Sequence, residues 1–175
     1  MLILGLDPGL TNFGWAILDA WTEEVKIGGV WTTTPESGVP RTVDLARRLE
    51  KLAADLDGKM RGFCFDGIAL EALALPFGRT SMVTVSTLGR VRGLVDYACA
   101  CRTPAGVRVA EYQAKHVKKT ITGVPTADKA EVGAALRRKI TGLDYVLASW
   151  PPSKHEHITD AAACAVTLAV EMKVM

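Results

Sequence analysis

The sequence has no apolar run of the roughly 20 residues that a membrane-spanning helix needs. Its start, MLILGLDPG, lacks both a basic leading segment and a small-residue cleavage site, which argues against a secretory signal peptide. It has few cysteines and no C-x-x-C pair, so neither a zinc site nor a redox motif is indicated. We therefore expect a cytoplasmic protein with no membrane partner and with reduced cysteines as small core residues. These are Cys64, Cys99, Cys101 and Cys164.

Low-complexity segments, internal repeats and long linkers are also missing. With 49% hydrophobic and 23% charged residues, the composition is that of an ordinary globular protein. A chain of 175 residues is long enough to bury one sizeable core. We expect a single domain over residues 1–175.

The net charge of +2 is too small to indicate nucleic-acid binding by itself, but the charges are unevenly distributed. Residues 1–35 hold one lysine against four acidic residues, whereas residues 108–139 hold eight basic residues against three acidic ones. A basic segment is typical of a surface that binds phosphates, and equally of a solvated helix face. Charge alone leaves both interpretations open.

The hydrophobic pattern predicts an α/β fold. Apolar runs bounded by turn residues predict strands over residues 2–7, 13–18, 25–34, 67–75 and 107–112. Helical periodicity predicts helices over about 40–56, 80–101, 112–121, 127–141 (capped by Thr126) and 155–173. This order favours a mixed five-stranded sheet, opened by an antiparallel three-stranded meander and covered by helices on both faces. Its ligand site is expected at the carboxyl ends of the central strands.

Two carboxylates fall on predicted strands. Asp7 ends the first strand, and Glu71 interrupts the middle of the fourth. A carboxylate in apolar surroundings is unfavourable unless it is paired or binds a cation. Asp7 also suits an ordinary Asp-Pro-Gly turn, but Glu71 has no turn role at the centre of a strand.

The last predicted helix adds a histidine and a further acid. His157 and Asp160 are three residues apart and therefore share one helix face. The small residues that follow, Ala161 to Ala163, would let this turn approach the strand ends. Alone, His157 would be a residue of the helix surface; together with Asp7, Glu71 and Asp160 it forms a candidate catalytic and metal-binding set. Such ligands favour Mg²⁺ or Mn²⁺ and a two-metal phosphodiester cleavage.

Several blocks of the sequence resemble the RuvC family of Holliday-junction resolvases, of the RNase H-like superfamily. They occur in the family's order and spacing over nearly the whole chain, as GLDPGLTNFGWAI (5–17), IALEALAL (68–75), LGRVRGLV (88–95), VAEYQAKHVKKTITG (109–123), TADKAEV (126–132) and HITDAAACAV (157–166). The resemblance implies an RNase H-like nuclease domain acting as a homodimer. It also implies Mg²⁺-dependent, symmetric nicking of a four-way DNA junction.

The resemblance also assigns residue roles. It places the catalytic acids on Asp7, Glu71, His157 and Asp160, and two functionally important lysines on Lys118 and Lys129. It makes the helix over 80–101 the dimer interface, although the spacing of Gly89 and Gly93 alone would favour helix-on-sheet packing. The full set expected to contact DNA is Lys115, Lys118, Lys119, Lys129, Arg79, Arg90, Arg92 and Phe77.

Two positions depart from the family pattern. Most members carry Asp where this chain has His157, although some related enzymes use His. The family's aromatic wedge, which stacks at the junction crossover, falls on Ala74. Phe77, three residues later, either takes over that stacking or packs in the core.

Other functions fit parts of the sequence. The DPGLTNFG segment resembles the first phosphate loop of actin-like proteins and sugar kinases, but those need a second domain and a second Gly-rich loop. An RNase H-like nuclease for flaps, forks or ribosomal RNA precursors would share the metal site. A DNA-binding protein with a decayed site would not retain four ligand-type residues. Whether branch-migration proteins are partners stays open at this point.

Overall fold

The computed structural model describes residues 1–73 and 81–175. One mixed sheet of five strands runs in the order β3-β2-β1-β4-β5. The strands are β1 (Leu2–Asp7), β2 (Asn12–Asp19), β3 (Glu24–Thr32), β4 (Gly67–Glu71) and β5 (Arg108–Tyr112). β1, β2 and β3 pair antiparallel, β4 pairs parallel with β1, and β5 pairs parallel with β4. The expected mixed five-stranded sheet and its opening meander are confirmed.

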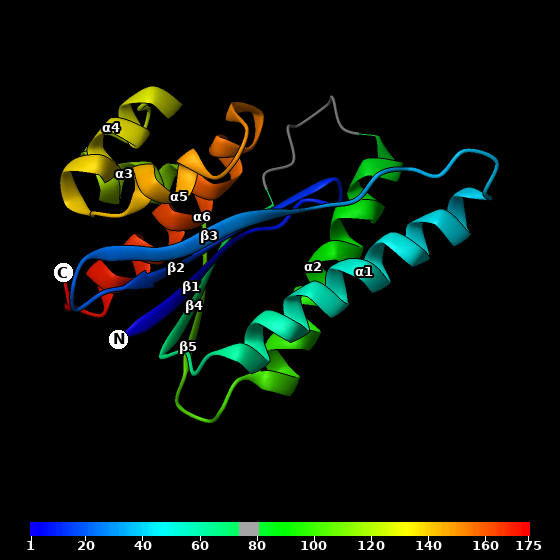
Figure 1. Cartoon of the computed structure of the whole chain (residues 1–175), viewed down its shortest axis with the longest axis horizontal. Helices are drawn as coiled ribbons and strands as arrows, with labels where there is room; N and C mark the ends of the chain where they lie inside the picture. Colours follow the sequence, from blue (N-terminus) through cyan, green and yellow to red (C-terminus); the bar gives the residue numbers. More distant parts are fainter. Residues whose placement is uncertain (74–80) are drawn as a thin grey trace.

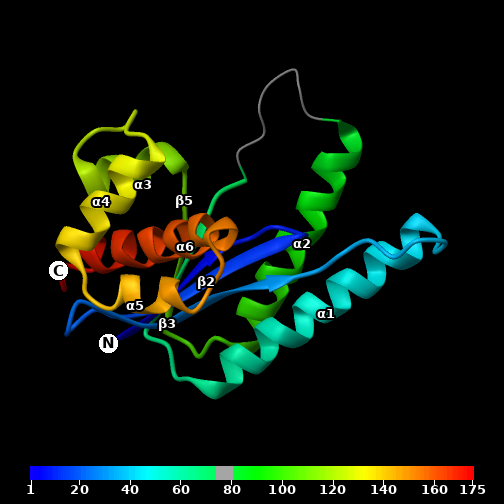
Figure 2. The ribbon, with the colours of Figure 1, turned by 45° about the horizontal axis from the view of Figure 1, so that its top comes forward.

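Helices cover both faces of this sheet, as the sequence predicts (Figures 1 and 2). One face carries α1 (Arg41–Gly62) and α2 (Met82–Arg102). The other carries α3 (Ala114–Thr122), α4 (Lys129–Lys139), α5 (Leu143–Ala148) and α6 (Pro152–Glu171). Because side chains alternate along a strand, Leu4 joins the core under α1 and α2 while Ile3 joins the core under α6. Two apolar cores therefore sandwich the sheet.

α6 lies directly on β1 and β2, without large side chains between the backbones. A Cβ atom on Gly5 would lie 1.9 Å from the carbonyl oxygen of Ala161, and one on Gly14 would lie 2.2 Å from that of His157. Both are far inside contact distance, so only glycine fits at these two strand positions. The two glycines bring the first half of α6, from His157 to Ala161, onto β1 and the start of β2.

Several boundaries differ from the sequence prediction. α1 continues to Gly62, and α6 starts at Pro152, which can occupy a first turn where no backbone N–H partner is needed. The helix predicted over 127–141 is α4, which ends at Lys139 because Ile140 is extended. The short helix α5, which follows the left-handed Gly142 (φ 78°), was not predicted. Asp128, not Thr126, caps α4, in a reciprocal capping box with Glu131.

The cysteine prediction is half right. Cys99 and Cys164 are buried, but Cys64 and Cys101 are exposed, because they lie on the outer surface of the α1–α2 side. All four are free thiols. Within residues 1–73 and 81–175, no helix is long and apolar enough to cross a membrane.

Candidate active site

Asp7 and Glu71 lie at the carboxyl ends of two adjacent parallel strands. Leu6 of β1 is in register with Leu70 of β4, and one residue further each strand ends in its carboxylate. Glu71 is thus the last residue of β4, not a residue at its centre as the sequence pattern predicted, because the strand stops well short of residue 75. Parallel pairing places both carboxylates at the same edge of the sheet.

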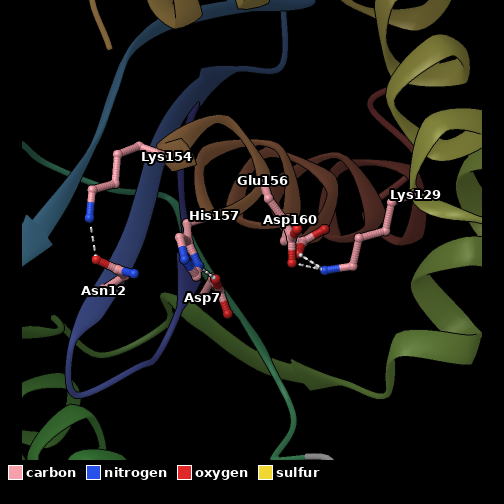
Figure 3. A network of polar contacts seen from close by, with 7 residues as sticks. All are labelled: Asp7, Asn12, Lys129, Lys154, Glu156, His157 and Asp160. Carbon is pink, nitrogen blue, oxygen red and sulfur yellow. Dashed lines mark hydrogen bonds and ion pairs between the residues drawn. The ribbon is translucent and has the colours of Figure 1, made fainter. Parts of the chain in front are cut away.

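α6 brings His157 to the same edge. Gly14 of β2 pairs with Asp7, and its missing side chain is the space that the backbone of His157 fills. The imidazole Nδ1 lies 2.8 Å from the Asp7 Oδ2 (Figure 3). This hydrogen bond raises the pKa of His157 above its ordinary value, although burial opposes the shift.

The four candidate residues line one cavity of about 280 Å³. Strand ends and α6 form its floor, and α3 and α4 form its far wall. Its complete lining is Asp7, Glu71, Ala114, Val117, Lys118, Lys129, Val132, Glu156, His157, Asp160, Ala163 and Cys164. The sequence prediction that Asp7, Glu71, His157 and Asp160 converge therefore holds at the level of a shared cavity.

A lysine from α4 reaches across this cavity. The Lys129 Nζ lies 3.3 Å from the Asp160 Oδ2 and also forms an ion pair with Glu156 (Figure 3). Glu156 and Asp160 are four residues apart on α6 and so face the same partner. Sequence reasoning did not place Glu156 in the candidate site, although its spacing of four residues from Asp160 was the signal that could have found it.

The clustered carboxylates disfavour one another's ionised forms. Burial, with the charges of Asp160 and Asp7 as further causes, raises the pKa of Glu71 from 4.5 to about 7. Burial likewise raises the pKa of Asp160, against the opposing charge of Lys129. Acids with raised pKa values inside a cavity are typical of functional sites, because clustering such groups does not stabilise a fold.

The donor set suits a divalent cation, but its side chains are not gathered into a ready-made cage. Among the described residues, no three His, Cys, Asp or Glu side chains already lie close enough together to hold one ion. His157 is hydrogen-bonded to Asp7, and Asp160 is paired with the ammonium of Lys129 instead of with a metal ion. Carboxylate oxygens with one imidazole are nevertheless the ligands that Mg²⁺ and Mn²⁺ accept.

Comparison with known proteins matches the family model for the crossover junction endodeoxyribonuclease RuvC over residues 3–168. The chain is 33% identical over 138 residues to such an enzyme from Rubrobacter xylanophilus, covering 78% of this chain and 70% of that protein. It is 33% identical over 167 residues to that of Xanthobacter autotrophicus, covering 95% and 88%. The chain belongs to the RuvC family. It is accordingly an endodeoxyribonuclease of crossover junctions.

The fold supports the same assignment. A structure titled T. thermophilus RuvC in complex with Holliday junction substrate superimposes with a TM-score of 0.74 at 26% identity, covering 99% of this chain and 97% of that one. The strand order and the helices on both faces thus belong to the RuvC and RNase H-like architecture that the sequence resemblance implied.

The residues expected to contact DNA in this RuvC-family chain lie in different settings. Lys118 and Lys129 line the cavity, whereas Lys115 and Lys119 are exposed elsewhere on α3. Arg90 is exposed on α2. Arg92, also on α2, is half-buried and forms ion pairs with Asp96 and Glu111. Phe77 and Arg79 lie outside the described residues.

A polar contact that sequence reasoning missed joins α6 to β2. The Lys154 Nζ donates to the Asn12 Oδ1 at 2.5 Å, beside His157 (Figure 3). Neither residue stands out in the sequence, because lysine and asparagine are ordinary at a helix start and after a turn. Only the fold brings these two residues together, across a separation of 142 positions.

The raised pKa of Glu71 predicts a pH-dependent loss of stability in the metal-free protein. The carboxyl has a pKa of about 7 when folded and near 4.5 when unfolded. Ionisation therefore destabilises the fold progressively as pH rises between these values, and fully above them. Glu71→Gln should unfold at a higher urea concentration than the parent protein at about pH 8 in EDTA, and at the same concentration near pH 4.

Glu50→Gln, at an exposed position of α1, is the matched control for that measurement. It should leave the urea midpoint unchanged at both pH values. Equal midpoints for Glu71→Gln and the parent protein at about pH 8 would contradict the buried-charge interpretation.

Proposed function

We propose that this RuvC-family chain resolves four-way DNA junctions by metal-dependent hydrolysis, in the cavity between the ends of β1 and β4 and the start of α6. The observation that carries the proposal is the convergence of three acids and a histidine on that cavity, with the Glu71 pKa raised to about 7. Similarity to a RuvC whose structure is titled as a complex with a Holliday junction substrate supports the four-way junction over flaps and forks. Family membership argues against the phosphate-binding kinase-like module.

The residues proposed to hold metal are Asp7, Glu71, His157 and Asp160. Mg²⁺ fits their oxygen-rich set, Mn²⁺ would substitute, and four ligand-bearing residues suffice for two ions. Two such ions, when bound, activate the attacking water and stabilise the leaving oxygen of a phosphodiester. For this role Asp160 exchanges the ammonium of Lys129 for the cation, Glu71 ionises, and His157 presents a neutral imidazole.

Lys129 and Lys118 are proposed to bind the DNA strand that is cut. Both project from the far wall of the cavity, opposite the carboxylates, so a phosphate that enters between the walls meets them. Lys129, once released from Asp160, remains within reach of the same space. Lys115 and Lys119 on α3, with Arg90 and Arg92 on α2, are proposed to contact the flanking duplex arms.

α2 is proposed to form the interface of a homodimer, because symmetric nicking of a four-way junction needs two sites in matching orientation. A Cβ atom on Gly89 or Gly93 would meet nothing within 4 Å, so these glycines do not serve helix-on-sheet packing. The same helix exposes Tyr97 (73%) and Met82 (82%). A second copy of α2 would cover such a surface.

The wider setting follows from this function. Residues 1–175 are proposed to act as one nuclease domain in the cytoplasm, on DNA and without a membrane partner. Proteins that drive branch migration would supply the moving junction that such an enzyme cuts.

Asp7→Asn tests the metal site directly. The change preserves shape and the hydrogen-bonding position beside His157 but removes the charge that holds a cation. Because loss of even an outer-shell partner of a metal ligand costs about 10- to 100-fold, cleavage of a four-way junction should fall at least about 100-fold. Nicking is measured with junction, flap and linear duplex substrates, and folding by circular dichroism.

Asp55→Asn on α1 makes the same charge change at an exposed ion pair with Lys51 and should cut normally. Wild-type cleavage by Asp7→Asn would show that Asp7 is not a metal ligand. Loss of the circular dichroism signal in this variant would show that Asp7 is a structural acid. Equal cutting of flap and junction by the parent protein would instead move the substrate assignment to the broader class.

His157 should give the enzyme a steep acid limit. Its pKa is raised by the hydrogen bond to Asp7, so the neutral, metal-binding imidazole is lost as pH falls through a value above the ordinary 6.5. His157→Asp should retain activity, move this limit to lower pH and shift preference from Mn²⁺ toward Mg²⁺, because carboxylate is the harder ligand. His157→Ala should be nearly inactive. Full activity of the alanine variant in pH-rate profiles with each metal would exclude His157 as a ligand.

The proposed interface can be tested at Gly93. Gly93→Leu places a bulky side chain on the α2 surface and should yield monomers that no longer nick junctions symmetrically. Gly58→Leu makes the same change on α1, where a Cβ atom also meets nothing within 4 Å, and should stay dimeric. Masses are compared by light scattering at micromolar concentration. A monomeric parent protein, or a dimeric Gly93→Leu, would contradict the α2 interface.

A further inference from the structure

A half-buried arginine lies beneath the loop that follows Asp7, although it does not line the active-site cavity. Arg48 comes from α1, and only 11% of its side chain is exposed. A guanidinium so far withdrawn from water needs acceptors that compensate its lost hydration. The identity of those acceptors indicates what Arg48 does.

Two of its acceptors are threonine hydroxyls, from different segments. The Nε donates to the Thr33 Oγ1 at 2.8 Å, and the Nη2 donates to the Thr11 Oγ1 at 3.0 Å. Asp44, one helical turn before Arg48, lies 3.7 Å from the Nη1 and balances its charge. The planar fork of Arg48 thus joins α1, the residue after β3 and the loop between β1 and β2.

Thr33 is in turn hydrogen-bonded to the loop between β1 and β2. It is 4% exposed, and its hydroxyl donates to the carbonyl oxygen of Leu10 at 2.5 Å. Its backbone N–H donates to the carbonyl oxygen of Thr11 at 3.0 Å. Leu10 and Thr11 belong to the segment that leaves β1 directly after Asp7. Arg48 and Thr33 therefore hold this segment through three of its oxygen atoms, namely the two carbonyl oxygens and the Thr11 hydroxyl.

We infer that Arg48 is a positioning residue of the active site, which holds the Asp7 carboxylate in its metal-binding orientation through Thr11 and Thr33. Asp7 stands at the last pairing position of β1, so the backbone that follows it is that of the loop. The start of β2, where this loop ends, is held from the other face of the sheet by the contact of Lys154 with Asn12. With both ties in place, the segment between Asp7 and Asn12 has little freedom to move.

This inference rests on the proposed role of Asp7 as a metal ligand, and it predicts a specific kinetic pattern. Arg48→Ala should weaken Mn²⁺ binding and lower kcat by up to about 100-fold, since a displacement of 1 Å at a reacting centre has that effect. KM for the junction should stay within about twofold, because Arg48 would not touch DNA. Arg48→Lys should restore only part of kcat, since one ammonium cannot match the two-pronged geometry of the guanidinium.

Arg47→Ala is the matched control. Arg47 is the neighbouring residue on α1 and pairs with Glu36 on the surface, where both side chains are more than half exposed. Its loss should leave kcat, KM and Mn²⁺ affinity unchanged. Thr11→Val is the second test variant: it removes the hydroxyl that Arg48 binds on the loop, at an exposed position, and keeps the arginine. It should change kcat and Mn²⁺ affinity in the same direction as Arg48→Ala.

Mn²⁺ binding is measured by calorimetry on the metal-free full chain, alongside junction kinetics and thermal unfolding. Wild-type Mn²⁺ affinity and kcat in folded Arg48→Ala would overturn the inference, as would a raised KM alone, which would make Arg48 a DNA contact. If Arg48→Ala does not fold, Thr11→Val decides by the same criteria. Asp7→Asn with unchanged Mn²⁺ affinity would instead overturn the proposed metal site, so the two failures are distinguishable.

Discussion

The direct contact between α6 and the sheet is the constraint on which the active site depends. It exists because Gly5 and Gly14 leave no Cβ atoms where the carbonyl groups of Ala161 and His157 must lie. Any larger residue would lift α6 and carry His157 and Asp160 away from the strand ends. The geometry of the candidate site thus depends on its polar residues and also on two glycines whose side chains take no part in it.

The close packing of α6 on the sheet also brings acidic side chains together, so that their charges repel one another. Burial, together with the nearby charges of Asp160 and Asp7, raises the pKa of Glu71 to about 7, so the acids resist joint ionisation. Lys129 relieves part of this repulsion through its ion pairs with Asp160 and Glu156. A divalent cation, with a higher charge than the ammonium of Lys129, would reduce the repulsion among the acids further. In the proposed function, the stability lost here in the metal-free protein is accompanied by affinity toward cations.

Much of the fold could be predicted from the sequence because its central elements are strongly patterned. The apolar runs before Asp7 and around Leu70 can only be buried strands, and the alanine-rich end of the chain suits a helix in close contact with a sheet. Boundaries failed where tertiary geometry decides them. The break at Ile140 and Gly142 separates α4 from α5 because the chain returns there to pair with Glu24 of β3, a long-range contact without a local signal.

The site divides in the same way. Asp7, Glu71 and Asp160 could be found because carboxylates in apolar or helix-face patterns are conspicuous, and the family resemblance placed them together. Arg48 could not be found, since an arginine in an amphipathic helix is predicted to face solvent. Thr33, which accepts a hydrogen bond from Arg48, could not be found either, because a threonine after a strand is an ordinary turn residue. Residues that act by holding others are visible only once the fold has brought distant segments together.

The distribution of charge finally decides which basic residues can serve DNA binding in a chain whose net charge is only +2. Arg92, expected near DNA, is engaged by Asp96 and Glu111, so much of its charge is already balanced within the protein. Lys118 and Lys129 line the cavity that holds the carboxylates. Lys129 is also ion-paired, with Asp160 and Glu156, but in the proposed function a bound cation releases it from Asp160. In the proposed function, electrostatic attraction of the cut strand should therefore depend on Lys118 and Lys129 more than on Arg92. Of the eight basic residues at 108–139, Lys118 and Lys129 line the cavity with the acids, which is where the proposed function requires phosphate-binding residues.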